Sequence, residues 1–533
     1  MIITLKRANT LNKRVIILII FLVALGVRLI ALKQNYVIAQ DGTLYIKMAQ
    51  LYSAGEYHHE IFREYPYYAV FPLFILASHK LFGDWVLAGQ WVSALCGALT
   101  VIPLYFLARR IFDEKIALLT ATFYIICPNL VRYSAEVLRD IPFVFFYTTA
   151  LWLAYRGIKA GRLFFVGLAG LFIALSSSLR IEGLTLLAVF AIFFSWLIRR
   201  NTIPWVKGLT AFGVLLVGTL SILIFGSFFL TQKGVKIGAI HILMAKNVLS
   251  LKILQDQTII GLEKEVENKG ISQAGKDFFH LARKHRFVLY SSHIFYKTVK
   301  VSNILFILFL FGLIKRRVIG YRQDEFLLFA TYVVFIPVFL LYLNVSNYLS
   351  TRHPFPLVVP SLIWSGVGFL ELKEKVILWM KGRNFSLSER ALRWVTTLLF
   401  LLICIPMLFM AWAPQRKDKL ELKEIGLWLK QNGHAHSIII GQLDFSRLAF
   451  YADGEFIQLP RGYYEDVMRF AREKKANLLV INEKTIDRFS PNFLNLVSPK
   501  DLQQIYIPGI KTPKYATMVF WVKELKGKGL NPR

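Results

Sequence analysis

Long runs of apolar residues alternate along the chain with short basic connections. A run of about 20 apolar residues crosses a lipid bilayer as one α-helix, so this pattern predicts a polytopic α-helical membrane protein. About eleven spans are expected, at residues 13–32, 84–108, 115–131, 140–155, 163–179, 183–198, 208–230, 300–314, 325–343, 354–370 and 393–412. One more apolar piece, residues 69–82, is too short to span, and we expect it to be re-entrant or interfacial.

The basic residues of the short connections indicate the orientation of the chain, because lysine and arginine accumulate in cytoplasmic loops. With a cytoplasmic N-terminus, the opposite short connections keep only Arg132, Arg139, Arg180 and Arg352. The cytoplasmic connections then carry Arg109, Arg110, Lys115, Arg156, Lys159, Arg162, Arg199, Arg200, Lys207, Lys315, Arg316, Arg317, Arg322, Lys373, Lys375, Lys381, Arg383, Arg390 and Arg393. An odd number of spans places the C-terminal region outside. We therefore expect a multi-pass protein of the cell (inner) membrane, with its first span a retained signal anchor.

Two domains are expected. Residues 1–412 would form the transmembrane domain, with a first outer loop at 33–83 and a segment along the membrane surface at 231–299. Residues 413–533 alternate short apolar strands with helical stretches, which predicts a small extracytoplasmic α/β domain. Its expected helices are 417–431, 446–451 and 463–475, and its expected strands are 437–441, 455–459 and 477–482.

The composition fits a membrane protein and argues against a nucleic-acid-binding protein and against a protein built on disulfides or cysteine-bound metal. The chain is 56% hydrophobic, and 64 Lys and Arg against 33 Asp and Glu give a formal net charge of +31. These basic residues crowd the ends of apolar spans, where they suit topology and anionic headgroups, so no nucleic-acid partner is expected. The cysteines Cys96, Cys127 and Cys404 lie far apart in apolar spans, which favours neither a disulfide framework nor a cysteine metal site.

A polar stretch at residues 40–45 directly follows the first apolar span. It contains Asp41, and Tyr45, Ala49 and Tyr52 follow at helical spacing. One interpretation is a helix start, because aspartate is a good N-cap and a carboxylate suits a helix N-terminus. The other is a functional carboxylate, because the remaining candidate polar clusters fall on the same side of the membrane as Asp41.

Two of those clusters lie at the mouths of neighbouring spans. Glu136, Arg139 and Asp140 stand at the entrance of the fourth span, where ionisable groups are functional candidates. Glu136 and Arg139 also have the i, i+3 spacing of an ion pair on a helix surface. In the next outer turn, Arg180 and Glu182 either neutralise each other or face the same cavity as Asp140.

The third cluster, residues 350–356, begins a proline-rich span. Pro354 suits the first turn of a helix, so a plain helix start is one interpretation. A guanidinium near a helix N-terminus is disfavoured unless an anion is bound there, which makes Arg352 a candidate phosphate ligand. Carboxylates suggest general-base catalysis and arginines an anionic leaving group. A lipid-linked phosphosugar has the properties that such a membrane face would bind.

These motifs, in this order, resemble those of the polytopic glycosyltransferases of the GT-C fold. That family uses polyprenyl-phosphate-linked sugars and includes protein mannosyltransferases and lipid A aminoarabinose transferases. The resemblance covers nearly the whole chain. It rests on a first-loop acidic motif, an aromatic-proline stretch, a second-loop acidic motif, an arginine-glutamate-glycine turn and an arginine before a late span. These motifs occupy residues 41–49, 65–74, 137–142, 178–183 and 351–354.

The resemblance implies an inverting sugar transfer from a polyprenyl phosphate to an acceptor hydroxyl on a lipid, a glycan or a protein. Asp41 would act as the general base and Asp140 as the second catalytic carboxylate. The donor phosphate would be bound by Arg352, Arg180 and Arg139. The residues implied to contact substrate are Tyr45, Tyr65, Glu136, Glu182 and His353.

Metal dependence stays open at this stage. Some members of the family bind a divalent cation near the carboxylates. His58, His59 and Glu60 could ligate one, and a solvated loop face is the alternative for these three residues. No other cofactor is expected.

Two functions without sugar transfer remain as alternatives. A lipid or glycan transporter or flippase would have polar residues near the bilayer midplane and broken helices in paired halves. The predicted spans are instead apolar at mid-depth, with their polar groups at one surface. A non-catalytic scaffold that displays the C-terminal domain would leave the clustered aspartates and arginines unexplained.

Overall fold

The computed structural model describes residues 13–232, 272–346, 348–383, 388–505, 507 and 517–523. The chain divides into two compact units, residues 1–32 with 48–413, and residues 33–47 with 414–533. The first unit is helical, and the second contains a five-stranded sheet. The helical membrane fold with a small C-terminal α/β domain is therefore confirmed.

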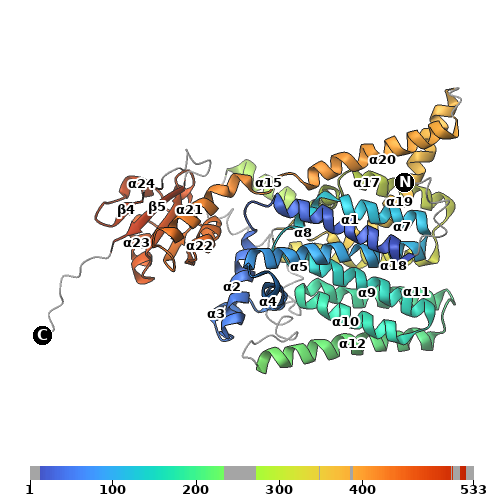
Figure 1. The fold of residues 1–533 in the computed structure, drawn as a ribbon, viewed down its shortest axis with the longest axis horizontal. Helices are drawn as coiled ribbons and strands as arrows, with labels where there is room; N and C mark the ends of the chain where they lie inside the picture. Colours follow the sequence, from blue (N-terminus) through green and yellow to red (C-terminus); the bar gives the residue numbers. More distant parts are fainter. Residues whose placement is uncertain are drawn as a thin grey trace. The chain divides into compact units, whose positions relative to one another are not determined.

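Long helices joined by short turns make up the first unit (Figure 1). Its helices, of which α1 and α2 extend into the second unit, are α1 (Lys13–Lys33), α2 (Gln40–Ala54), α3 (Glu60–Glu64), α4 (Val70–Phe82), α5 (Trp85–Leu99), α6 (Val101–Ile111), α7 (Glu114–Ile126), α8 (Pro128–Ser134), α9 (Asp140–Ala160), α10 (Leu163–Leu179), α11 (Thr185–Arg199), α12 (Trp205–Gln232), α15 (Gln273–Lys284), α16 (Arg286–Ser302), α17 (Ile304–Ile319), α18 (Phe326–Val345), α19 (Phe355–Gly382) and α20 (Glu389–Ala411). Short 3-10 turns are η2 (Pro66–Tyr68), η3 (Ile181–Leu184) and η5 (Gln323–Glu325).

Within the described ranges, seven helices are long and apolar enough to cross a membrane, or up to nine if each of two bent helix pairs is one span. The bent pairs are α7 with α8, at 57°, and α16 with α17, at 107°. The sequence predicted about eleven. The two remaining predicted spans form α9, whose 21 residues include Asp140, Arg156 and Lys159, and α10, which has only 17 residues. With 17 residues, α10 is a shorter apolar helix than the counted spans, and α9 is not among those spans.

The predicted surface segment 231–299 falls partly on residues 233–271, which lie outside the described residues. Its other residues end α12 and form α15 and most of α16. In α15, Phe278 and Leu281 are exposed beside Lys276 and Arg283, a pattern typical of helices on a membrane surface. That location remains a prediction.

Glycines allow close helix crossings inside the first unit. A Cβ at Gly312 would overlap the carbonyl oxygen of Trp364, and a Cβ at Gly368 would overlap that of Leu308, so α17 and α19 pack backbone to backbone. Such crossings are typical of membrane helices, where packing replaces the hydrophobic driving force. They fix the spacing of the helices whose ends carry the polar clusters.

One polar cluster lies at the C-terminal ends of α9 and α17. Glu325 is fully buried and accepts hydrogen bonds from Arg316 Nε at 2.9 Å and from Trp364 Nε1 at 2.8 Å. Nearby in sequence, Asp324 pairs with Lys159 at 2.5 Å. Because Lys159 is near the end of α9 and Asp140 is its first residue, the bundle has polar groups at both ends of this helix.

The second unit contains a mixed sheet with strand order β2-β1-β3-β5-β4. The β1–β2 and β1–β3 pairs are parallel, and the β3–β5 and β4–β5 pairs are antiparallel. Its elements are η6 (Lys417–Lys419), α21 (Leu420–Gln431), β1 (Ile438–Gly441), η7 (Leu443–Phe445), α22 (Ser446–Tyr451), β2 (Glu455–Gln458), α23 (Tyr464–Glu473), β3 (Leu478–Asn482), η8 (Ile486–Arg488), α24 (Phe493–Leu496), β4 (Leu502–Gln504) and β5 (Thr517–Val522). One core cluster includes Val467 and Leu479, and the other includes Leu422 and Val480, because alternate residues of a strand face opposite sides.

Residues 33–47 belong to the second unit through backbone contacts. Asn35 forms a parallel bridge with Gln415, and Gln40 Nε2 donates to the carbonyl oxygen of Leu443 at 3.1 Å. Arg447 Nε donates to the carbonyl oxygen of Ile38 at 3.2 Å. The stretch that contains Asp41 is therefore attached to the C-terminal domain.

Candidate active site

Asp140 begins α9, at the end of the loop that follows α8. The loop is held by α5, where Gln90 donates to Ala135 O at 3.1 Å and Ser93 donates to Leu138 O at 3.0 Å. Asp140 is 2% exposed, and a carboxylate in the first turn of a helix is stabilised by the helix dipole. The sequence thus places a buried carboxylate at a helix start.

Arg180 links two carboxylates at the neighbouring helix end. It is the residue after α10, and its Nη1 forms an ion pair with Asp140 Oδ1. Its Nη2 pairs with Glu182 Oε1 at 2.7 Å, and its guanidinium lies 5.6 Å from the ring centre of Phe143. Arg180 and Glu182 therefore do more than neutralise each other, because Asp140 shares the same guanidinium.

The turn that holds Arg180 and Glu182 is packed tightly against α10. A Cβ at Gly183 would lie 2.5 Å from the backbone nitrogen of Ser177 and 2.7 Å from the carbonyl carbon of Ser176. Backbone atoms cannot move aside as a side chain can. Only glycine fits, so Gly183 fixes where the arginine and the glutamate stand.

The segment before α19 brings a second guanidinium to Asp140. Arg352 Nη1 lies 3.4 Å from Asp140 Oδ2, and its side chain is 24% exposed. The segment is attached to α8 by a hydrogen bond between the hydroxyls of Thr351 and Tyr133, at 2.6 Å. The two arginines thus contact different oxygens of one carboxylate.

Arg139 is the third arginine of this group. Its Nη1 donates to the carbonyl oxygen of Leu179 at 2.6 Å, which satisfies a carbonyl at the C-terminal end of α10. Its guanidinium lies 4.2 Å from the ring centre of Tyr68, and Tyr68 stacks on Tyr65 with ring centres 5.8 Å apart. The aromatic stretch before α4 is therefore part of the same cluster.

Electrostatics keep Arg180 charged and His353 neutral. Burial alone would lower the pKa of Arg180, but the carboxylates of Glu182 and Asp140 outweigh it and raise this pKa above its usual value. Burial, followed by the charge of Arg180, lowers the pKa of His353 to about 3. His353 Nδ1 donates to Ser350 O at 3.3 Å, so the neutral imidazole has a fixed partner.

The structure brings together most of the residues that the sequence singled out on this side. Asp140, Arg180, Glu182, Arg352 and His353 interact with one another electrostatically, and Arg139 acts on Asp140. Glu136 is 1% exposed, in the loop before Asp140. Asp41, in the first turn of α2, and Tyr45, which is 1% exposed, fall in the second unit.

Four residues that contact this cluster were not selected as site residues from the sequence: Tyr68, Tyr133, Phe143 and Thr351. Tyr68 belongs to the aromatic stretch at 65–68, of which only Tyr65 was selected. Thr351 precedes Arg352, so proximity in sequence was a usable signal for it. No local signal distinguishes Tyr133 or Phe143 from other aromatic residues of a membrane helix.

The described residues contain no group of three or more His, Cys, Asp or Glu side chains placed to hold a metal ion. In the suggested set, His59 Nδ1 accepts a hydrogen bond from the backbone nitrogen of Ile61 at 3.2 Å, as the N-cap of α3. Asp140 and Glu182 both bind Arg180, so a guanidinium occupies the place between these two carboxylates. The residue set of this cluster fits an anion better than a cation.

Comparison with known families finds a match over part of the chain. Residues 68–225 match the model of the dolichyl-phosphate-mannose-protein mannosyltransferase family. This segment includes Arg139, Asp140, Arg180 and Glu182, and it ends before Arg352. No curated protein matches the chain in a sequence search.

Solved structures share the fold. The archaeal oligosaccharyltransferase AglB from Archaeoglobus fulgidus, in complex with an inhibitory peptide and a dolichol-phosphate, has a TM-score of 0.57 and 13% identity, over 97% of this chain and 75% of that one. ArnT from Cupriavidus metallidurans, bound to undecaprenyl phosphate, has a TM-score of 0.55 and 12% identity, over 95% of this chain and 97% of that one. At this identity the likeness concerns the fold, and it confirms the GT-C architecture expected from the motifs.

Proposed function

We propose that the protein is a membrane glycosyltransferase that moves a sugar from a polyprenyl-phosphate donor to an acceptor hydroxyl, with inversion. The observation that carries this proposal is the buried carboxylate of Asp140 with Arg139, Arg180 and Arg352 around it. Three of these four residues lie in the segment that matches the mannosyltransferase family model, which supports the same activity.

The donor phosphate would bind at the arginines. Three guanidiniums against the two carboxylates Asp140 and Glu182 leave these five side chains with one positive charge in excess. The Arg352 side chain is 24% exposed and that of Arg180 8%, so Arg352 is the more accessible donor of hydrogen bonds. A guanidinium fork matches phosphate oxygens bidentately. The lipid phosphates in the AglB and ArnT structures belong to the same ligand class.

In the proposed reaction, the acceptor oxygen attacks the anomeric carbon from the face opposite the phosphate, and the bond from that carbon to the phosphate oxygen breaks. The configuration at this carbon is thereby inverted. The hydroxyl proton passes to the carboxylate of Asp41, the proposed general base. Arg352 and Arg180 stabilise the negative charge that develops on the leaving phosphate, and Asp140 holds both guanidiniums in place.

Support for Asp41 comes from its first-loop motif and from its position in the first turn of α2. Asp140 is the second candidate for the base. The contacts to substrate proposed for Tyr45, Tyr65, Glu136, Glu182 and His353 rest on the same motifs. Their side chains would shape the sugar and acceptor subsites.

The reaction is assigned to the outer face of the cell membrane. The basis is the excess of lysine and arginine in the short connections at the opposite ends of the helices. On this topology the N-terminus is cytoplasmic and the C-terminal α/β domain extracytoplasmic. A reporter fused after Trp412 would read the topology, and a cytoplasmic signal there would refute both the orientation and the outer-face reaction.

The activity is tested with purified full-length protein and a panel of radiolabelled polyprenyl-phosphate hexoses and pentoses, with native membrane lipids as acceptors. We expect release of polyprenyl phosphate from at least one donor. Asp41→Asn should lower this rate by roughly 10²-fold, because the amide keeps the helix start but accepts no proton. Asp84→Asn is the matched control, since Asp84 caps α5 through the nitrogen of Leu87 and asparagine also caps.

Three outcomes would change the proposal. Transfer by Asp41→Asn at the parent rate would make Asp140 the base. Failure of the parent protein to convert any donor, together with movement of labelled lipid across vesicle membranes, would establish the flippase alternative. A loss of transfer in Asp84→Asn equal to that in Asp41→Asn would show that the effect comes from helix stability.

A further inference from the structure

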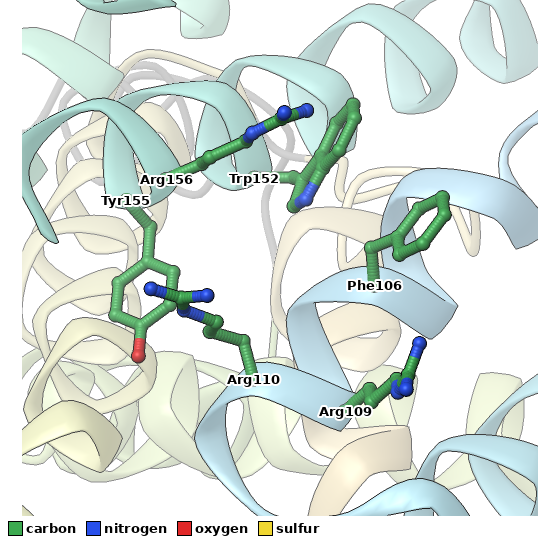
Figure 2. Close-up of a pocket in the computed structure, with 6 residues that line it drawn as sticks. All are labelled: Phe106, Arg109, Arg110, Trp152, Tyr155 and Arg156. Atoms are coloured by element: carbon green, nitrogen blue, oxygen red, sulfur yellow. The ribbon is translucent and has the colours of Figure 1, made fainter. Parts of the chain in front are cut away.

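A second basic site lies at the other end of α9. There α6 and α9 enclose a cleft of about 680 Å³, lined by Phe106, Arg109, Arg110, Trp152, Tyr155 and Arg156. Figure 2 shows these side chains coming from the two facing helices. The volume is within the range of ligand pockets, roughly 300–1,000 Å³. It exceeds what one inorganic ion would fill.

The lining combines cations with aromatic rings. Phe106 from α6 and Trp152 from α9 stack on each other, with ring centres 5.2 Å apart and planes at 16°. The Arg156 guanidinium lies 5.5 Å from the ring centre of Trp152 and 4.0 Å from that of Phe165 on α10. These rings hold the guanidinium on an apolar wall and leave its hydrogen-bond donors for a ligand.

The three arginines differ in their partners. Arg109 forms an ion pair with Glu114 at 2.6 Å. Arg110 and Arg156 form no ion pair with any carboxylate in the part of the chain that the structure describes. Two guanidiniums on adjacent helices, with one wall of aromatic carbon, make a site for an anion that also carries an apolar part.

The position of Arg156 along α9 indicates which part of the bilayer the cleft faces. Arg156 is 16 residues after Asp140, and at 1.5 Å per residue this is about 24 Å along the helix. That distance is close to the thickness of the hydrocarbon core, about 30 Å. The cleft therefore lies at the membrane surface opposite the candidate active site, where aromatic and basic residues meet lipid headgroups.

We propose that this cleft binds the phosphate of an anionic membrane lipid, with Arg110 and Arg156 as its ligands. The aromatic wall formed by Phe106 and Trp152 packs against the first carbons of the lipid. Basic pockets between membrane helices are a recognised form of site for anionic headgroups. The bound lipid fastens α6 to α9, and through α9 it steadies the helix whose first residue is Asp140. The site does not depend on the proposed transferase activity.

Binding is measured on the purified full chain by native mass spectrometry, with dioleoylphosphatidylglycerol as the probe and dioleoylphosphatidylcholine as the zwitterionic reference. Arg110→Gln with Arg156→Gln should weaken phosphatidylglycerol binding by roughly tenfold or more, because two charge-assisted contacts are lost. The control is Arg199→Gln with Arg200→Gln, which removes the same charge from exposed positions at the C-terminal end of α11. The control should bind within about twofold of the parent.

Each other result has a defined meaning. Equal weakening in both double variants, or none in the cleft variant, would overturn the site, because binding would then follow total charge. Displacement of phosphatidylglycerol by inorganic phosphate at equal affinity would overturn the lipid assignment. If the double glutamine variant does not fold, the double variant Arg110→Lys with Arg156→Lys is measured instead. Lysine keeps the positive charge but lacks the two parallel N–H donors of a guanidinium. A parent-like affinity in that lysine pair would refute bidentate phosphate binding.

Discussion

Asp140→Asn is expected to change protein stability and lipid-phosphate affinity in opposite directions. The substitution keeps the shape of the side chain but removes the negative charge that faces Arg180 and Arg352. We expect the protein to become less stable, and we expect a lipid phosphate to bind it more tightly. Transfer activity should fall, because the two guanidiniums lose the group that positions them.

The loss of stability can be estimated from burial. Removing one partner of a buried ion pair costs about 3–5 kcal/mol. Arg180 is only 8% exposed, but it keeps Glu182 at 2.7 Å, and the amide oxygen of the substituted side chain can still accept its hydrogen bond. Arg352 is 24% exposed and retains some hydration. The expected cost is therefore at the lower end of that range, about 3 kcal/mol.

The gain in phosphate affinity comes from charge. The excess of guanidiniums over carboxylates rises from one to two when Asp140 is neutralised. One additional unpaired charge about 6 Å from a phosphate is worth about 3 kcal/mol in a medium of effective dielectric constant 20, before desolvation is subtracted. If half of this attraction is realised, the affinity rises about tenfold.

The assay is thermal unfolding of the purified protein with and without undecaprenyl phosphate. Asp140→Asn should unfold at a lower temperature than the parent and be stabilised more by the lipid phosphate. Asp84→Asn, at the exposed cap of α5, should match the parent in both measurements. Weaker lipid-phosphate binding by Asp140→Asn, or stability equal to that of Asp84→Asn, would refute the assignment of this cluster as an anion site.

Three further predictions concern the same cluster. Arg352→Lys should lower lipid-phosphate affinity by roughly tenfold, because an ammonium does not replace the guanidinium fork; parent-like binding in a titration would count against the phosphate contact. Gly183→Ala should reduce transfer, because a Cβ meets the backbone of Ser176 and Ser177 and displaces the turn that holds Arg180 and Glu182; Gly213→Ala, where a Cβ meets nothing within 4 Å, should be neutral. The pKa of His353 is about 3 in the folded protein, below its value of about 6.5 in the unfolded chain. As the pH drops below about 6.5, the imidazole is therefore protonated in the unfolded chain but not in the folded one, and the stability of the folded protein falls. Unfolding between pH 7.5 and 5 should show a smaller loss of stability for His353→Gln than for the parent, and parallel pH curves would show that His353 is not buried neutral.

The long apolar helices of the first unit were predictable because a bilayer demands long apolar segments, and the same demand makes their residue pattern conspicuous. The parallel strands β1, β2 and β3 were also predictable, since each is a short apolar run between turn residues and helices. Strand β4 was not, because Leu502–Gln504 holds one buried residue and, among the described strands, pairs with β5 alone. Such pairing depends on the folded sheet rather than on local sequence.

The candidate site was predictable as a set of charges but not as a set of contacts. The common side of the membrane indicated that Asp140, Arg180 and Arg352 would lie together, and the structure brings these three into contact. Two contacts depend on how helices far apart in sequence pack: the bridge that Arg180 forms between two carboxylates, and the hydrogen bond between Tyr133 and Thr351. The attachment of residues 33–47 to the C-terminal domain rests on backbone bonds, which side-chain patterns do not reveal.

The central claim, that the arginine cluster binds the donor phosphate, is tested most directly by a structure of the purified protein with undecaprenyl phosphate. We predict density for the phosphate within hydrogen-bonding distance, about 3 Å, of the Nη atoms of Arg352, with Arg180 alongside. The lipid phosphate bound elsewhere, with Arg352 and Arg180 contacting only Asp140 and Glu182 as before, would contradict the proposed donor site.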